Sequence, residues 1–142
     1  MTTTHDPIFR EFLRRFFPDF MRLFFPNEAA YLDFSTANRI EQELISNFPD
    51  PKVRVSDVVV EIGTVKGDEQ VVLVHIEVEA SRKGSLPARM FEYYSLLRAL
   101  RKKPVLPLAC VLIPNVGGLQ WQTYRETLFG NSSGIYRKLF RL

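Results

Sequence analysis

The sequence predicts a single α/β domain that spans residues 1–142. Its length suits one compact domain, and its content of 46% hydrophobic and 25% charged residues is ordinary for a globular protein. Apolar residues recur at helical spacing in the N-terminal third and again after residue 86, whereas β-branched residues dominate residues 57–80. No internal repeat and no linker in the sequence indicates a second domain.

The N-terminal segment is expected to form two short helices that meet at Pro18. Asp6 can cap the first helix with Pro7 at its first position, and Pro18 breaks that helix and can begin the second. The apolar stripe of these helices comprises Phe9, Phe12, Leu13, Phe16, Phe17, Phe20, Leu23 and Phe24. A basic, aromatic helix can bind a membrane surface. We favour packing against the domain's own sheet, because a small domain needs such aromatics for its core.

Two longer helices are expected further along the chain. One runs from about Ser35 to Phe48 and carries Glu43 near its middle. The other runs from about Leu86 to Lys102, and cations gather near its end at Arg98, Arg101, Lys102 and Lys103. The helix dipole accounts for these cations, and we give this account slightly more weight than contact with the phosphates of a nucleic acid.

A β-hairpin is predicted where DVVVEIGTV and VVLVHIEVEA flank the turn segment KGDEQ. If Lys66–Asp68 forms a three-residue loop, the numbers of residues that face each other sum to 134, so Asp57 lies opposite Glu77. Side chains alternate between the two faces of a strand, so Glu77 shares a face with Glu79 and with His75. His75 lies one pair further into the sheet, where we expect it to make a hydrogen bond in the core.

Carboxylates gathered on one face of a hairpin destabilise it and raise each other's pKa. A divalent cation offsets this cost, because Mg²⁺ prefers hard oxygen ligands such as carboxylates. Solvated charges on the outer face of an amphipathic hairpin explain the same spacing equally well. The spacing alone therefore leaves a metal site and a solvated face open.

Three segments bear on this choice: SDVVVEI, LVHIEVEAS and ARMFEYYSLL, followed by the expected strand PLACVLIPN. Their order resembles the PD-(D/E)XK nuclease superfamily, and more narrowly the bacterial group of recombination-promoting nucleases and transposase-like proteins, which is frequent in cyanobacteria. The segment PDFMRLFFPNEAAYLDFS also fits that group. The resemblance implies a restriction-endonuclease-like core, in which a mixed sheet of four to five strands is flanked by helices.

The same resemblance implies a DNA endonuclease that hydrolyses phosphodiester bonds with Mg²⁺ or Mn²⁺, linked to recombination or mobile elements. Asp57 and Glu77 would bind the metal, and Glu43 matches a helix acid that assists the metal in some members. Glu79 stands where the superfamily has a catalytic Lys and this group often has Gln. Asp57, Glu77 and Glu79 are therefore the expected catalytic residues.

Glu79 departs from the pattern of the family in a chemically important way. A carboxylate cannot donate a hydrogen bond to a phosphate as Lys does, although it can serve as a third metal ligand or as a base for the water. The missing cation could come from Arg82, Lys83 or Arg89, with Arg98 as a further contact to the nucleic acid. For Arg89, a salt bridge to a carboxylate of the site is an equally good explanation.

Composition limits the partners and the compartment. The net charge of +3 is compatible with DNA, and the single Cys110 excludes a disulfide framework. The start MTTTHD lacks the features of a signal peptide, and no run is long enough to span a bilayer. We therefore expect a cytoplasmic protein that binds DNA and no membrane. The alternatives are a catalytically inactive nuclease-like domain that binds DNA or protein or forms a homodimer, and a structural module with a solvated acidic face.

Overall fold

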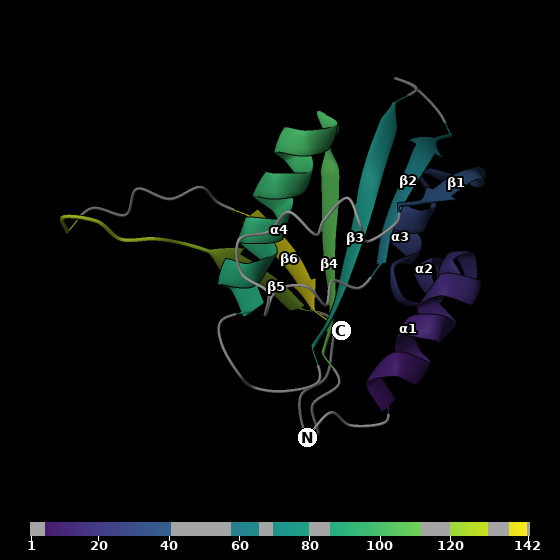
Figure 1. Ribbon diagram of the computed structural model, residues 1–142, viewed down its shortest axis with the longest axis horizontal. Helices are drawn as coiled ribbons and strands as arrows, with labels where there is room; N and C mark the ends of the chain where they lie inside the picture. The colour runs from purple at the N-terminus through teal and green to yellow at the C-terminus, as the bar shows by residue number, and fades with distance from the viewer. Residues whose placement is uncertain are drawn as a thin grey trace.

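A computed structural model describes residues 5–40, 58–65, 70–79, 86–111, 120–130 and 137–141 of the chain. Its helices are α1 (His5–Arg15), α2 (Phe17–Phe24), α3 (Pro26–Ala29) and α4 (Leu86–Arg101). Its strands are β1 (Leu32–Arg39), β2 (Val58–Thr64), β3 (Val71–Glu79), β4 (Val105–Val111), β5 (Gln120–Tyr124) and β6 (Arg137–Arg141). Figure 1 shows the sheet between two layers, with α1, α2 and α3 on one face and α4 on the other.

The strands form one mixed sheet in the order β1-β2-β3-β4-β6-β5. The pairs β1-β2, β2-β3 and β5-β6 are antiparallel, whereas β3-β4 and β4-β6 are parallel. The prediction of an α/β fold with a mixed sheet flanked by helices is therefore confirmed. Strands β1 to β4 form a contiguous group of four, and β6 and β5 extend the sheet to six, beyond the four to five strands that we expected.

The central hairpin has the predicted register. Val58 pairs with Ile76, Val59 with His75 and Val60 with Val74, so the residue numbers of each pair sum to 134. The turn and the alternation of apolar residues are local signals, and together they set which face each side chain takes. The predicted pair of Asp57 with Glu77 would come next, but Asp57 lies outside the described residues.

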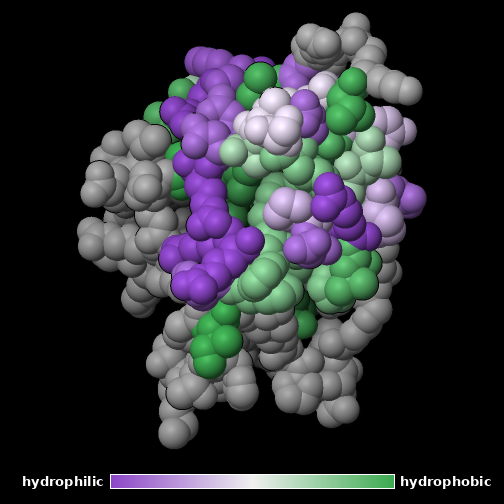
Figure 2. All heavy atoms as spheres, turned by 90° about the vertical axis from the view of Figure 1, so that its right-hand side faces the viewer, coloured by the Kyte–Doolittle hydropathy of each residue, from purple (hydrophilic) through white to green (hydrophobic). Residues whose placement is uncertain are grey.

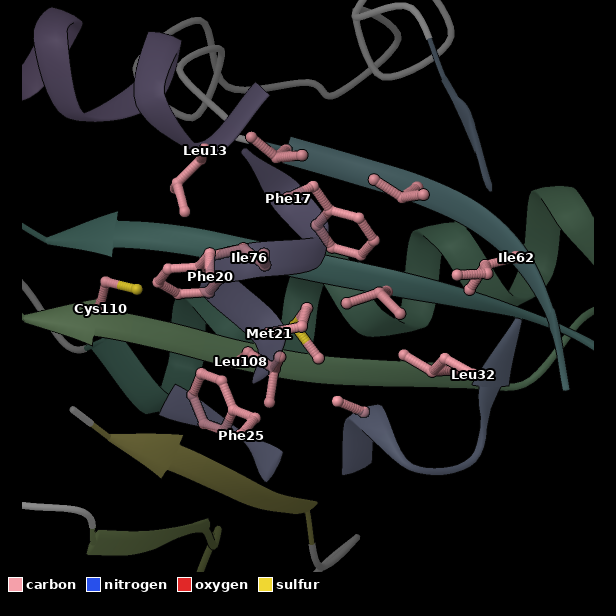
Figure 3. Packing of buried hydrophobic residues seen from close by; sticks show 14 of the residues in the cluster. Leu13, Phe17, Phe20, Met21, Phe25, Leu32, Ile62, Ile76, Leu108 and Cys110 are labelled. Atoms are coloured by element: carbon pink, nitrogen blue, oxygen red, sulfur yellow. The ribbon is translucent and has the colours of Figure 1, made fainter. Parts of the chain in front are cut away.

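The N-terminal helices supply one half of the core, as we expected. Helix α2 begins at Phe17 and has Pro18 as its second residue, and the buried residues of α1 and α2 pack with the apolar face of the sheet (Figure 3). The members labelled there are Leu13, Phe17, Phe20, Met21, Phe25, Leu32, Ile62, Ile76, Leu108 and Cys110. The predicted packing of these helices against the domain's own sheet is thus confirmed for the buried residues. None of the helices in the described ranges is both long enough and apolar enough to cross a bilayer.

The predicted stripe on these helices is only partly buried. Leu13 and Phe17 lie in the core, whereas Phe12 and Phe16 are partly exposed and contact each other with ring centroids 5.4 Å apart. The reason is that a helix buries only the side that faces the core, so aromatic residues at the edge of the stripe stay partly exposed. Figure 2 shows this face of the molecule, where hydrophilic residues form a band beside an apolar area.

The helix expected from Ser35 is wrong for its first turn, because this segment belongs to strand β1. The side chain of Asp33 accepts hydrogen bonds from the backbone and hydroxyl of Ser35, and the hydroxyl of Thr36 accepts one from the backbone of Gly63 in β2. Short polar side chains that bond to nearby backbone favour non-helical conformations, and the edge of β2 offers a partner strand. Residues 41–48 of the expected helix lie outside the described residues.

Helix α4 covers the other face of the sheet and has the predicted position. Tyr93 and Leu97 pack with Val59 and Leu73, whereas Leu86 and Met90 pack with the end of β4. On its far side, Phe91 stacks on Tyr124 of β5 with ring centroids 4.7 Å apart. A hydrogen bond from the Tyr124 hydroxyl to Glu126 is the main cause that raises the pKa of Tyr124. The packing of Leu86 and Met90 on Ala109 and Val111 places the start of α4 near the carboxyl end of β3, which pairs with this part of β4.

Candidate functional site

The candidate site is centred on Glu77, a buried carboxylate near the carboxyl end of β3. The residue is only 4% exposed, and its backbone pairs with Ala109 of β4. The alternation of β3 places its apolar partners Val74, Ile76 and Val78 in the core beneath α1 and α2. Glu77 therefore lies on the face that α4 covers.

Arg89, from the start of α4, reaches this carboxylate. Its Nε lies 3.3 Å from Oε1 of Glu77, and its side chain is 24% exposed. Removing an ionised carboxylate from water is costly unless a charged partner or hydrogen bonds stabilise it. The guanidinium supplies that partner, and the positive end of the α4 dipole lies in the same region. Of the two roles considered for Arg89, the structure shows the salt bridge to a carboxylate.

His75 approaches the same carboxylate from within β3. Its Nε2 lies 3.4 Å from Oε2 of Glu77, and the imidazole is fully buried. The ring of Tyr93 packs on the imidazole with centroids 5.0 Å apart and an angle of 52° between the planes. His75 thus lies in the core, as expected, but its approach to Glu77 lacks the geometry of a hydrogen bond, so the expected hydrogen bond is not confirmed. The two oxygens of Glu77 have different neighbours.

Sequence reasoning placed His75 on the face of Glu77, because His75 stands two residues earlier on the same strand. It did not foresee that Tyr93 of α4 packs on the ring of His75, since a contact between a helix and a strand leaves no signal in the spacing of residues.

Most of the other predicted site residues cannot be placed. Asp57, Glu43, Arg82 and Lys83 lie outside the described residues. The backbone of Glu79 pairs with Val111, but its side chain is not among those described. The clustering of acids around Glu77 therefore stays a prediction.

Arg98 is described, and the structure does not bring it to Glu77. It follows Arg89 by nine residues on α4, which corresponds to about 13 Å along the axis and half a turn around it. Nearby Lys103 forms an ion pair with Glu61 of β2. The basic end of α4 is therefore separate from the carboxylate, and a nucleic acid would have to span both positions to contact them together.

The donor set around Glu77 was tested for its fit to a metal ion. Within the described ranges, no group of three His, Cys, Asp or Glu side chains comes together. Glu77 offers the hard oxygen that Mg²⁺ prefers, whereas His75 offers a nitrogen that Mg²⁺ does not. A complete Mg²⁺ site thus needs oxygen ligands from outside the described residues, and Asp57 and Glu43 are the predicted ones.

Comparison with known proteins gave no match. No family model matches the chain, and neither a curated protein nor a solved structure matches it. The resemblance to PD-(D/E)XK nucleases therefore depends on the sequence segments quoted above alone.

Proposed function

We propose that this protein is a metal-dependent DNA endonuclease of the PD-(D/E)XK type, linked to recombination or mobile elements. The observation that carries the proposal is the buried carboxylate of Glu77 at the carboxyl end of a central strand. In open α/β sheets, ligands bind outside the carboxyl ends of the strands. A buried acid at that position, beside the start of a helix, supports a role for Glu77 as a metal ligand.

The proposed site combines Glu77 with Asp57 and Glu43 as ligands of Mg²⁺ or Mn²⁺. The hairpin register supports the contribution of Asp57, because the pairing of Val58 with Ile76, continued by one residue, would bring position 57 opposite Glu77. Such a metal activates a water and stabilises the charge that builds on a phosphate being cleaved. Glu79 would act as a third ligand or as a base for the water, and Arg82 and Lys83 would contact the DNA backbone.

A second candidate is a catalytically inactive nuclease-like domain that binds DNA or protein. The contact between Arg89 and Glu77 favours it, because a carboxylate that is already neutralised by a guanidinium needs no cation for stability. The presence of Glu79 at the position of the catalytic Lys also favours the catalytically inactive candidate. Both candidates use the same fold, and only the chemistry at Glu77 separates them.

Nicking of supercoiled plasmid in Mg²⁺ or Mn²⁺ tests the proposal. The wild type is expected to nick the plasmid, and EDTA or Glu77→Gln is expected to abolish nicking because each removes the metal from the site. Glu77→Gln preserves the shape of the side chain, so a lost activity reports the lost charge.

Glu92→Gln is the matched control, since Glu92 is an exposed carboxylate on α4. It should nick as fast as the wild type. If the folded wild type does not nick at high concentration in either metal, the second candidate is favoured. Nicking by Glu77→Gln at the wild-type rate would remove Glu77 from the chemistry altogether.

A further inference from the structure

We infer that residues 125–130 form an arm whose apolar tip, Leu128 and Phe129, inserts between the base pairs of duplex DNA. This role rests on the DNA partner of the proposed function, but it needs no metal and no chemistry at Glu77. Phe129 is 91% exposed and Leu128 is 56% exposed. Figure 1 shows the arm, in yellow-green, leading from β5 away from the helices and the sheet.

The backbone at the tip does not suit a phenylalanine. Phe129 has a φ of 53° and Gly130 a φ of 76°, and two successive residues with positive φ are typical of the type I′ turn, which favours Asn-Gly. A bulky residue in this conformation is an outlier, and the exposed ring gains little from packing in return. The other described non-glycine residue with positive φ, Lys102, follows the end of α4, where this conformation is common. Strain at an exposed turn indicates a function for the ring beyond the stability of the chain.

The base of the arm carries positive charge. Arg125 follows Tyr124 directly, and β6 brings Arg137 opposite Tyr124, with Lys138 next along the strand. Glu126 is the only acidic residue of β5, β6 and the segment between them. Such a surplus of cations suits the phosphates of a nucleic acid. Two copies of the arm facing each other would instead bring like charges together, which is unfavourable.

The arm is long enough to contact phosphates and bases together. Phe129 follows Arg125 by four residues, which is a span of at most about 14 Å in an extended chain. The minor groove of DNA is about 7.5 Å deep, so the tip can reach the base pairs while the cations contact phosphates at the rim. Exposed Phe and Leu side chains are among the wedges that proteins insert between base steps, and insertion unstacks the bases and kinks the duplex.

The base of the arm is anchored on the helix that covers the candidate site. The ring of Tyr124 stacks on Phe91 of α4, with centroids 4.7 Å apart and an angle of 17° between the planes. Arg89, which contacts Glu77, precedes Phe91 by two residues. The arm therefore starts at the end of α4 that carries the candidate site, which favours one duplex as the partner of both.

Phe129→Asn separates the wedge from the fold. Asn tolerates a positive φ better than Phe does, so this variant should be at least as stable as the wild type in urea denaturation. Phe129→Leu retains an apolar wedge. Leu23→Gln is the matched control, because Leu23 is an exposed apolar residue on α2, 71% accessible to solvent.

Insertion is measured on a duplex that carries a dye at each end and 2-aminopurine in place of several adenines, with Ca²⁺ present to prevent cleavage. The wild type, Phe129→Leu and Leu23→Gln should raise the energy transfer between the dyes, because the duplex bends, and the 2-aminopurine fluorescence, because bases unstack. Phe129→Asn should lose both signals and bind the duplex about tenfold more weakly in fluorescence anisotropy.

The outcomes separate the wedge from the endonuclease. If the wild type binds DNA without these signals, or Phe129→Asn keeps them, the wedge is overturned and the proposed endonuclease stands. Bending and unstacking without nicking in Mg²⁺ or Mn²⁺ support the wedge and reject the endonuclease. No binding of DNA by the wild type rejects both. A wild-type dimer and a Phe129→Asn monomer in sedimentation velocity without DNA would show that the tip docks on a second copy, which overturns the wedge.

Discussion

At the scale of single residues, the contact between Glu77 and Arg89 links the chemistry of the site to the stability of the domain. The carboxylate is almost completely buried, and the guanidinium reaches it from another element. Removing one member of such a pair leaves the other charge in a poorly solvated environment. Arg89 is therefore expected to contribute to stability whichever function the domain has.

The first prediction concerns Arg89→Met, which retains much of the apolar stem of the side chain and removes its charge. We expect it to lower the free energy of unfolding by about 1–3 kcal/mol, because Glu77 loses its charged partner. Urea denaturation followed by circular dichroism measures the change. Arg98→Met is the matched control on the exposed side of the same helix, and it should change stability by less than about 0.5 kcal/mol.

Adding Glu77→Gln to Arg89→Met should recover part of the lost stability, because a neutral amide no longer needs a cation. Equal losses for Arg89→Met and Arg98→Met would show that the contact seen between Arg89 and Glu77 does not stabilise the fold.

The residue scale also shows how far the sequence could predict the site. The sequence identified both Glu77 and Arg89 as candidate site residues. It left open whether Arg89 supplies the missing cation to the phosphate or forms a salt bridge to a carboxylate of the site. The choice depends on how closely α4 approaches β3, which is a matter of tertiary packing and leaves no local signal. The same limit applies to Tyr93, whose contact with His75 joins a helix to a strand.

At the scale of elements, the sequence predicted the strand pairing that depends on neighbouring residues. It missed the pairing that depends on residues far apart in the chain. The register of β2 with β3 followed from a short turn and a period of two. Strand β1 was not foreseen, because its pairing involves a hydrogen bond between residues 27 positions apart, from the backbone of Gly63 to Thr36. The polar sequence of β1 lacks the β-branched enrichment that marked β2 and β3.

The second prediction compares two phenylalanines on α2. Phe20 is fully buried in the core, whereas Phe24 is 38% exposed. Phe20→Ala should lower the free energy of unfolding by about 3–5 kcal/mol, the usual cost of deleting a buried aromatic side chain. Phe24→Ala should cost clearly less, and both values are accessible by urea denaturation. Similar values would mean that α2 does not pack on the sheet through Phe20.

At the scale of the whole molecule, the helices on the two faces of the sheet cover different sets of residues. Helices α1 to α3 bury the apolar face, and α4 covers the face with Glu77 (Figure 1). Helix α4 also carries cations at its far end, at Arg98 and Arg101. Under the proposed function, a duplex that contacts both the candidate site and Arg98 would have to reach around α4, because Arg98 lies half a turn around the helix from Arg89.

The third prediction tests that geometry by fluorescence anisotropy with duplex DNA, using Ca²⁺ in place of Mg²⁺ to prevent cleavage. Affinity should fall as salt rises, with a slope of about −0.9 for each phosphate that is neutralised. Arg98→Ala should reduce that slope by about one if Arg98 contacts a phosphate. Arg14→Ala, on α1 beneath the opposite face, is the control and should leave the slope unchanged. Binding that does not respond to salt would contradict a phosphate-backbone contact.

Strand β3 has a consequence for how such a domain can change over evolutionary time. Val74, Ile76 and Val78 point into the core under α1 and α2, whereas Leu73, His75 and Glu77 lie on the opposite face. A lineage can therefore exchange the polar side chains of β3 without disturbing the core under α1 and α2, and it can repack that core without moving the acid. Under the proposed function, loss of catalysis through changes on the face with Glu77 would leave the core under α1 and α2 intact.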